Sequence, residues 1–322
     1  MLEVNRAQVL AYRATVHGLE SVRRAEVLDT GVQDTPPGKS AHLALRARNL
    51  STDGLVLVHS LRGTMHWHRE ADVALLAAAM RESFAGAAEA EPGPVALTKG
   101  ELSTAVTRLV DRQLTPWCAT CGVHHPNDGL FRIATLQAGL RLRPDGVFVA
   151  GDVVEAVEPE VARRELLRRY LRVCGPATPA QLAAWTGFTT SATKRWWNLL
   201  DLLEMRVDGR RAWGLDDAVL AAAPPVATRL LPPYDPLAEI ADRALIAPDP
   251  AHRAQIWRPA ANPGLVLVAG EVVGVWRQKL LRHRLTIRIT GFGPLQRESL
   301  VDEAEAVGAS LGASSVDVIL AS

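Results

Sequence analysis

Residues 161–215 constrain the fold of this chain more than any other segment. Apolar residues recur there at three-to-four-residue intervals, which is the period of a helix with one buried face; they are Val161, Leu166, Tyr170 and Val173. Gly175-Pro176 then predicts the end of this helix. Thr178, followed by a proline, has the residue pattern of an N-cap and predicts a second helix over residues 178–185.

A third helix and a hairpin follow in the same segment. Gly187 predicts a tight turn, and the helix after it is expected to reach about Met205 with an exposed face formed by Thr193, Lys194, Arg195 and Asn198. Residues 206–213 predict a β-hairpin, because Asp208-Gly209 is a strong two-residue turn signal. Three helices and a basic hairpin are typical of a winged helix, which places one helix in a DNA groove. The same domain also serves as a protein-interaction module or a spacer.

The earlier part of the chain repeats this plan. Helices are predicted over residues 5–17, 21–29, 41–49 and 71–84, and strands over 55–63 and 64–70. Further helices are predicted over 104–113 and 130–139, with a strand pair around the turn at 144–146. We therefore expect a first winged helix in residues 1–90, a second in 91–157 and the third in 158–222.

The last part of the chain has a different character. Residues 265–277 and 285–292 predict strands joined by tight turns, followed by a helix over 298–311 and a strand over 315–320. Residues 226–322 are thus expected to form a small β-barrel-like domain. The predicted fold class is α+β, with tandem winged-helix domains followed by this C-terminal β-barrel-like domain.

Charge is segregated in this C-terminal region, although the net charge of the whole chain is only +1. Residues 276–297 contain six Lys or Arg and no acid, whereas residues 298–322 contain five acids and no base. Such segregation can present a basic surface to nucleic acid without a high overall pI. The residues expected to contact DNA are Lys194, Arg195, Arg210, Arg211, Arg277, Arg282 and Arg284. Trp276 is a further candidate, whereas one tryptophan of Trp196-Trp197 is expected in the core.

Composition favours an intracellular protein. The three cysteines do not suit a disulfide framework and are compatible with a reducing cytosol. The first residues predict an amphipathic helix rather than a signal sequence, and no apolar run reaches the ~18 residues that a membrane span needs. We expect a cytoplasmic bacterial protein that associates with the nucleoid and not with a membrane.

A cysteine- and histidine-rich loop occupies residues 117–125. Cys118 and Cys121 form a CxxC pair, and His125 is the nearest further ligand type that suits Zn²⁺. His124 and His125 are adjacent and rarely bind one ion together, so a fourth ligand would come from elsewhere. The alternatives are two half-buried cysteines or a redox pair. A zinc-dependent hydrolase would rest on this loop alone.

Residues 230–277 resemble the signature of the bacterial winged-helix family that includes the YcaQ/AlkZ-type DNA glycosylases. The resemblance covers nearly the whole chain, and its specific part is the C-terminal pattern. Members of that family combine tandem winged helices with a C-terminal β-barrel-like domain. They excise bulky alkylated purines and unhook interstrand crosslinks. The resemblance therefore implies a DNA repair protein.

The family's catalytic motif, Gln-x-Gln or Gln-x-Asp, matches Gly31, Val32 and Gln33 of this sequence, followed by Asp34. The second Gln is present as Gln33, but the first is replaced by Gly31. The resemblance implies that Gln33 orients a water molecule, with Asp34 or His66 assisting; His66 and His68 are expected on one face of their strand. A simpler interpretation of the run from Gln33 to Asp34 is that it caps the next helix.

Two functions follow from these observations. The first is a monofunctional DNA glycosylase that hydrolyses the N-glycosidic bond of alkylated N7-type purines, including bulky or crosslinked ones. It would act as a monomer on double-stranded DNA held between the first winged helix and the C-terminal domain. No cofactor is required for such hydrolysis, although the Cys/His loop suits a structural Zn²⁺. The alternative is a non-enzymatic DNA-binding protein, either a transcriptional regulator or a damage sensor, which the replacement by Gly31 favours.

Overall fold

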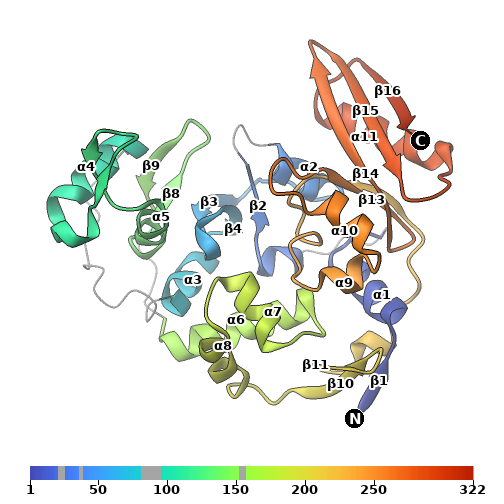
Figure 1. The fold of residues 1–322 in the computed structure, drawn as a ribbon, viewed down its shortest axis with the longest axis horizontal. Coiled ribbons are helices and arrows are strands. Elements are labelled where there is room, and N and C mark those ends of the chain that lie inside the picture. The colour runs from blue at the N-terminus through green and yellow to red at the C-terminus, as the bar shows by residue number, and fades with distance from the viewer. Residues whose placement is uncertain (21–25, 36–38, 81–95, 152–156, 322) are drawn as a thin grey trace. The chain divides into compact units, whose positions relative to one another are not determined.

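The computed structural model describes residues 1–322 except 21–25, 36–38, 81–95, 152–156 and 322 (Figure 1). The chain forms two compact units. Unit 1 comprises residues 1–52 and 168–322, and unit 2 comprises residues 53–167. The division of the chain into four domains stays a prediction. No helix among the described residues is long and apolar enough to cross a bilayer.

Residues 159–214 have the three helices and the hairpin that their sequence predicts. These are α6 (Pro159–Cys174), α7 (Pro179–Thr186), α8 (Thr190–Trp197), β10 (Leu203–Val207) and β11 (Arg210–Gly214). Thr178 forms a capping box with Gln181 at the start of α7. Asp208 and Gly209, with φ of 45° and 77°, make the hairpin turn. The first strand, β1 (Leu2–Val4), pairs in parallel with β10 and completes a small sheet.

Three expectations for this segment were wrong. Helix α8 ends at Trp197 rather than near Met205, because residues 203–207 instead pair with two neighbouring strands. Thr193 is buried rather than exposed, and its hydroxyl donates to the Pro179 carbonyl 2.8 Å away, which joins α8 to α7. Val161 is 56% exposed, although Leu166, Tyr170 and Val173 are buried as expected. Trp196 lies in the core, as predicted.

The described residues of the N-terminal part of unit 1 form two α-helices with a compact turn region between them. Its elements are α1 (Arg6–Val16), a 3₁₀ turn (Glu26–Asp29), β2 (Val32–Gln33) and α2 (Ser40–Arg46). Asn5 caps α1, as expected. Of the helix predicted over 21–29, residues 21–25 lie outside the described residues, and the remainder forms the 3₁₀ turn. Helix α2 ends at Arg46, three residues earlier than predicted.

A buried polar cluster joins these N-terminal elements to the rest of unit 1. Arg48 and Asp235 form an ion pair with both side chains fully buried, in which two N–O distances are 2.8 Å. His17 lies beside Arg48 and contacts the Val173 carbonyl through Nε2, at 3.0 Å. Burial, followed by the neighbouring Arg48 charge, lowers the pKa of His17 to about 3, so this imidazole is neutral at pH 7.

Arg13 of α1 belongs to the same cluster. Its guanidinium donates to the carbonyls of Cys174, Gly175 and Pro176, at distances of 2.9 to 3.3 Å. These carbonyls follow the last turn of α6, where a helix leaves its carbonyl groups without helical partners. Arg13 therefore fixes the end of α6 against α1.

The C-terminal domain is an open sheet, and the expected barrel was wrong. Its elements are β12 (Thr228–Leu231), α9 (Arg243–Ile246), α10 (Pro250–Ile256), β13 (Gly264–Val268), β14 (Glu271–Leu281), β15 (Arg284–Gly291), α11 (Arg297–Ser310) and β16 (Ser315–Ala321). The five strands lie in the order β12-β13-β14-β15-β16, so the first and last are edges that do not pair with each other. Helix α11 packs against the sheet and connects β15 to a parallel β16, whereas barrel closure would require β16 to meet β12.

Helix α2 contributes to the core of this domain. Leu43 of α2 packs with Trp276, Leu285, Ile287 and residues of α11. Arg46 of α2 also pairs with Glu303 of α11 at 3.1 Å. The segment that carries Gln33 is thus held against the C-terminal domain.

The described residues of unit 2 before α6 form hairpins, helices and a short cysteine-containing ribbon. Its elements are β3 (Leu55–His59), β4 (Met65–Arg69), α3 (Asp72–Met80), β5 (Ala96–Thr98), α4 (Lys99–Leu109), β6 (Trp117–Cys118), β7 (Val123–His124), α5 (Asp128–Gln137), β8 (Leu140–Leu142) and β9 (Val147–Ala150). Helix α4 begins five residues before its predicted start at 104, because Thr98 and Glu101 form a capping box. Residues 81–84 of the predicted helix over 71–84 lie outside the described residues.

We predict that Asp235→Asn lowers the free energy of unfolding by about 3–5 kcal/mol, because it leaves the Arg48 charge buried without its partner. Asp317→Asn is the matched control, since it removes an ion pair to Arg284 that is largely exposed, and it should cost less than about 1 kcal/mol. Urea unfolding followed by circular dichroism measures both. Equal costs for the two variants would contradict the role given to the buried pair.

Candidate active site

Gln33 is the last residue of β2 and is buried, with 8% of its surface exposed. Its side-chain oxygen Oε1 is buried and has no hydrogen-bond partner among the described residues. A buried acceptor left in this state costs about 1–3 kcal/mol, so native proteins rarely keep one without a reason. The amide oxygen is therefore an acceptor that the described part of the chain does not satisfy, at the position where the sequence predicts a catalytic side chain.

Gly31 precedes this residue in a conformation that explains its identity. Its φ is 77°, in the left-handed region that favours glycine. A glutamine at this position would carry a Cβ in the same strained backbone, at a cost of roughly 1–2 kcal/mol. Restoring the missing Gln of the motif would therefore strain the backbone at residue 31.

Asp34 follows Gln33 and acts on the start of α2. Its Oδ1 accepts hydrogen bonds from the Thr35 N–H (2.9 Å), the Ser40 hydroxyl (3.2 Å) and the Ala41 N–H (3.5 Å). Ser40 also lies 3.5 Å from the Gln33 carbonyl, to which its hydroxyl donates. The capping interpretation therefore describes the contacts of Asp34 but not those of the Gln33 side chain.

A second carboxylate anchors the other side of the turn. Asp29 is buried and accepts from Arg172 Nη1 at 2.8 Å, which ties the turn to α6. The Thr30 hydroxyl donates to the Val27 carbonyl and closes the 3₁₀ turn. Contacts on both sides thus position the Gly31–Gln33 segment.

His66 belongs to unit 2, so the site described above is built without it. It is buried on β4 together with His68, while Trp67 between them is more exposed, which confirms the predicted alternation. Burial lowers the pKa of His66 to about 4, and its Nδ1 lies 3.1 Å from the Thr64 carbonyl. This imidazole is neutral at pH 7. Its assistance to Gln33 stays a prediction.

The family model described as "DNA glycosylase AlkZ-like" matches residues 27–313. This chain belongs to the AlkZ-like DNA glycosylase family. The matched region begins just before the Gly31–Gln33 segment and ends after α11. The resemblance read from residues 230–277 is thereby confirmed.

A solved structure of the Streptomyces sahachiroi DNA glycosylase AlkZ is similar to this AlkZ-like chain. The TM-score is 0.78 and the sequence identity 21%, over 99% of this chain and 100% of that chain. At this identity the likeness shows a shared fold. No curated protein matches the sequence.

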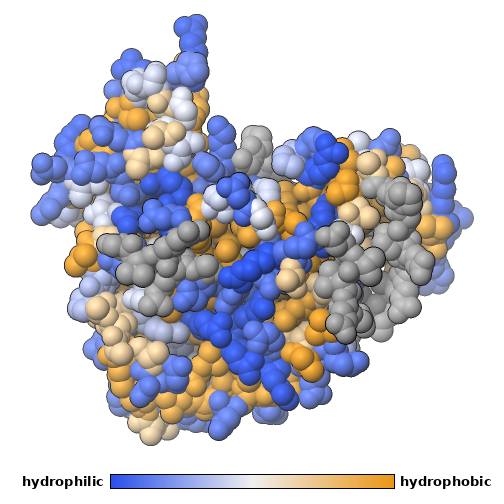
Figure 2. Space-filling view, turned by 180° about the vertical axis from the view of Figure 1, so that it is seen from behind, coloured by the Kyte–Doolittle hydropathy of each residue, from blue (hydrophilic) through white to orange (hydrophobic). Residues whose placement is uncertain are grey.

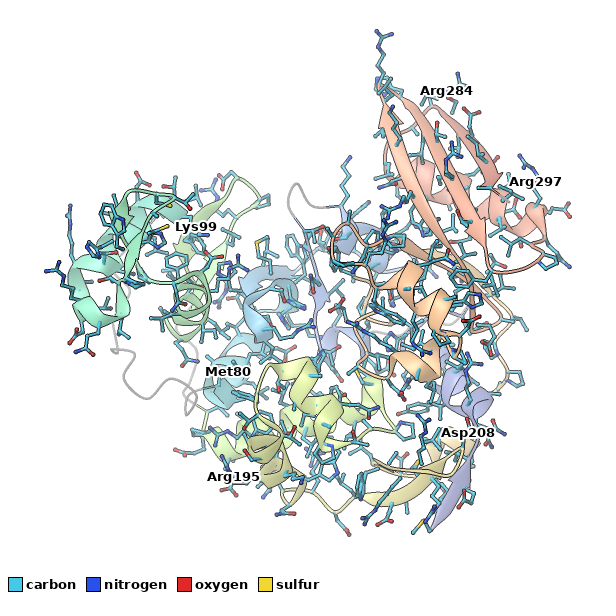
Figure 3. All side chains as sticks on the ribbon, viewed as in Figure 1. Met80, Lys99, Arg195, Asp208, Arg284 and Arg297 are labelled. Atoms are coloured by element: carbon cyan, nitrogen blue, oxygen red, sulfur yellow. The ribbon has the colours of Figure 1, made fainter. Side chains whose placement is uncertain are left out.

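The predicted contact residues of α8 and of the neighbouring hairpin are exposed in this AlkZ-like structure. Lys194 and Arg195 lie on the surface of α8, and Arg195 points away from the fold (Figure 3). Arg210 is exposed next to the hairpin turn. Arg211 is also exposed, but it pairs with Glu204 at 2.6 Å and stacks over Trp213.

The β14–β15 hairpin carries the other predicted contacts. Arg282 lies in its two-residue turn with φ of 53°, and Arg284 follows, paired with Asp317 at 2.7 Å. Arg277 is exposed and donates to the Ala261 carbonyl at 2.8 Å. Figure 2 shows hydrophilic side chains at the end of this sheet, at the upper left. Trp276 was wrongly expected at the surface, since it is buried and donates to the Leu231 carbonyl at 2.7 Å.

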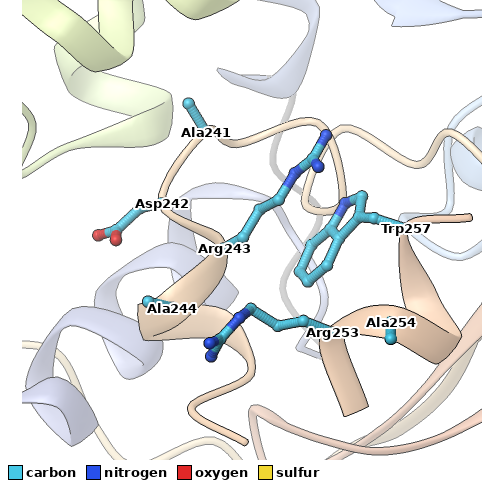
Figure 4. Close-up of a pocket in the computed structure, with 7 residues that line it drawn as sticks. All are labelled: Ala241, Asp242, Arg243, Ala244, Arg253, Ala254 and Trp257. Atoms are coloured by element: carbon cyan, nitrogen blue, oxygen red, sulfur yellow. The ribbon is translucent and has the colours of Figure 1, made fainter. Parts of the chain in front are cut away.

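Sequence reasoning missed a cavity beside α9 and α10, which is lined by two arginines and by Asp242. The cavity measures about 460 Å³, and Arg243, Arg253 and Trp257 line it (Figure 4). The Arg243 guanidinium lies over the Trp257 ring at 5.1 Å, and Arg253 donates to the carbonyls of Ala247 and Pro248. A second cavity of about 340 Å³ follows along α10 and reaches Arg277. The spacing of arginines and tryptophan in residues 243–258 was the available signal.

The three predicted metal ligands of unit 2 lie together. Their ligand atoms, in Cys118, Cys121 and His125, are all within 4.8 Å of one another. The pKa of Cys118 is lowered to about 7, mainly by the backbone N–H of Cys121. Thiolate and imidazole groups in this arrangement suit a soft or borderline cation.

We predict that Gln33→Leu leaves the free energy of unfolding unchanged or raises it by up to about 1–3 kcal/mol, because it removes a buried acceptor without a partner in the described part of the chain. Asp34→Ala should instead lower it by about 1 kcal/mol, through the loss of the contacts at the start of α2. Chemical denaturation of the two variants provides the comparison. A clear loss of stability in Gln33→Leu would mean that this side chain is structural.

Proposed function

We propose that this AlkZ-like protein is a monofunctional DNA glycosylase that hydrolyses the N-glycosidic bond of alkylated purines. The expected lesions are N7 adducts, including bulky or crosslinked ones. The observation that carries the proposal is the buried, unsatisfied Oε1 of Gln33 at the family's motif position.

The reaction needs little from the protein beyond a positioned water molecule. An N7-alkylated purine carries a positive charge, so it leaves as a neutral base when the bond from N9 to the sugar C1′ breaks and N9 takes the electron pair. Water then forms the new bond to the oxocarbenium-like C1′ and loses a proton. The Gln33 oxygen accepts a hydrogen bond from this water and directs its lone pair at C1′.

An amide takes up no proton, so the proton from the attacking water passes to a nearby base or to solvent. His66, neutral at pH 7, and Asp34 are the proposed assistants, and Asp34 also accepts hydrogen bonds at the start of α2. No cofactor enters this hydrolysis. The base need not leave the helix stack, because a bulky adduct resists extrusion.

The proposed substrate is double-stranded DNA, bound by a monomer in the bacterial cytoplasm in association with the nucleoid. We propose that the helix-and-hairpin segments act as tandem winged helices. The supporting features are the exposed residues Lys194 and Arg195 on α8 and the basic end of the β14–β15 hairpin. DNA would run past the β2–α2 segment, which packs on the C-terminal domain through Leu43.

Excision assays test the proposed chemistry. Duplex DNA with 7-methylguanine, and then with a bulkier N7 adduct, is incubated with the protein and treated with alkali, which breaks the strand at abasic sites. We expect excision by the unaltered chain and a loss of about 100-fold or more in rate for Gln33→Ala, which is the order of magnitude lost when one positioned hydrogen-bonding group is removed from an active site.

Gln113→Ala is the control for this loss, because Gln113 is an exposed residue of unit 2 and has no part in the proposed chemistry. DNA affinity is measured in parallel by fluorescence anisotropy. If Gln33→Ala excises at the full rate, the proposed role of Gln33 is wrong. If the unaltered chain excises neither lesion, the glycosylase proposal fails.

One observation favours the alternative of a non-enzymatic regulator or damage sensor. Gly31, with φ of 77°, occupies the position of the motif's first glutamine. Tight, salt-sensitive DNA binding without excision would support this alternative. A dimer that recognises two half-sites would identify a regulator, whereas a monomer without sequence preference would fit a sensor.

The proposed DNA contacts are tested by the salt dependence of binding. Each phosphate contact contributes about 0.9 to the slope of log K against log salt concentration. The double variant Lys194→Ala/Arg195→Ala should therefore lower the slope by about 1.8. Arg112→Ala, at an exposed arginine of unit 2 outside the proposed contacts, serves as the control. An unchanged slope in the double variant would exclude α8 from the phosphate contacts.

A further inference from the structure

The short ribbon of β6 and β7 has little hydrophobic support of its own. Each strand has two residues, and their side chains Trp117 and Val123 are 59% and 52% exposed. A two-stranded ribbon of this length is not stable on its own in water. Small elements without a core are commonly held by a disulfide or a metal ion.

The turn between the strands brings two sulfur atoms to one side. Gly122, with φ of 65°, donates its N–H to the Cys118 carbonyl at 2.8 Å and reverses the chain directly after Cys121. The ligand atoms of Cys118, Cys121 and His125 lie within 4.8 Å of one another. In a tetrahedral zinc site with such ligands these distances are about 3.5–3.8 Å, so shifts of about 1 Å complete the geometry.

The Nδ1 atom of His125 makes a hydrogen bond that leaves its Nε2 atom able to bind a metal ion. Its Nδ1 lies 2.7 Å from the Pro126 carbonyl. A carbonyl only accepts hydrogen bonds, so Nδ1 carries the proton and Nε2 carries the free lone pair. This Nε2 is buried and has no hydrogen-bond partner among the described residues. Metal-binding histidines typically donate their other N–H to a carbonyl or carboxylate in this way.

We propose that Cys118, Cys121 and His125 bind one Zn²⁺ ion, with water as the fourth ligand. Two thiolates and one imidazole are the ligand types that zinc prefers at a tetrahedral site. His124 is a poor fourth ligand, because its Nδ1 contacts the Thr115 carbonyl at 2.9 Å and its ring packs on Trp117. Within the described residues the cluster has these three members.

The ion would cross-link the ribbon to the start of α5. His125 lies two residues before Asn127, whose side chain caps α5, and α5 carries Phe131 into the core of unit 2. Zinc binding thus replaces the missing hydrophobic core of the ribbon. This role is independent of the chemistry proposed for Gln33, which needs no metal.

Metal content of the full chain tests the proposal. The protein is purified through a tag without histidines, under reducing conditions, and zinc is measured by mass spectrometry. We expect about one Zn²⁺ per chain, and its loss in the double variant Cys118→Ser/Cys121→Ser. Cys174→Ser is the matched control, because Cys174 is buried in unit 1 and should leave the zinc content unchanged.

Cobalt replacement tests the ligand set even if the serine variants fold poorly. The Co²⁺ form of the unaltered chain should show thiolate-to-cobalt charge transfer and the strong visible bands of a tetrahedral site. His125→Gln should weaken zinc binding against a competing chelator by at least 10- to 100-fold, the usual effect of losing even an outer-shell partner. Zinc below about one-tenth of an equivalent with no cobalt spectrum, or a disulfide between the two cysteines in the freshly purified chain, would overturn the proposal.

Discussion

The fully buried ion pair of Arg48 and Asp235 is the contact on which the organisation of unit 1 depends. Arg48 follows α2, and Asp235 follows β12, 187 positions further along the chain. Desolvating two charges is costly, so the pair tolerates little displacement of either partner. Through His17 and Arg13 the same cluster reaches the end of α6. The N-terminal segment is thereby fixed both to the end of α6 and to the segment that follows β12.

The elements held by this cluster surround Gln33, whose side chain is not optimised for stability. The backbone around Gln33 is secured by Asp29 on one side and Asp34 on the other, while no described residue donates a hydrogen bond to the Gln33 side-chain oxygen. Functional sites commonly carry such a local cost and are supported by stable surroundings. Gly31 contributes to the same arrangement. Its left-handed conformation sets the direction of the strand that ends in Gln33.

The elements that the sequence predicted well are those governed by local chemistry. The Asp208-Gly209 turn and the N-cap at Thr178 both follow from residues within a few positions of one another. The family resemblance at residues 230–277 was also available, because its pattern is continuous in sequence. Gln33 was found only through that resemblance. Its buried oxygen depends on packing that no local pattern encodes.

What the sequence did not predict depends on contacts between distant residues. The length of α8 was overestimated because residues 203–207 have helix-compatible side chains but gain more from pairing with β1 and β11. The expected barrel was wrong because the local sequence does not reveal whether the two edge strands, β12 and β16, pair with each other, and in the structure they do not. Arg13 and Arg48 were missed because an isolated arginine is normally read as a solvated residue. These two arginines can be buried only because the fold brings carboxylate and carbonyl groups to them.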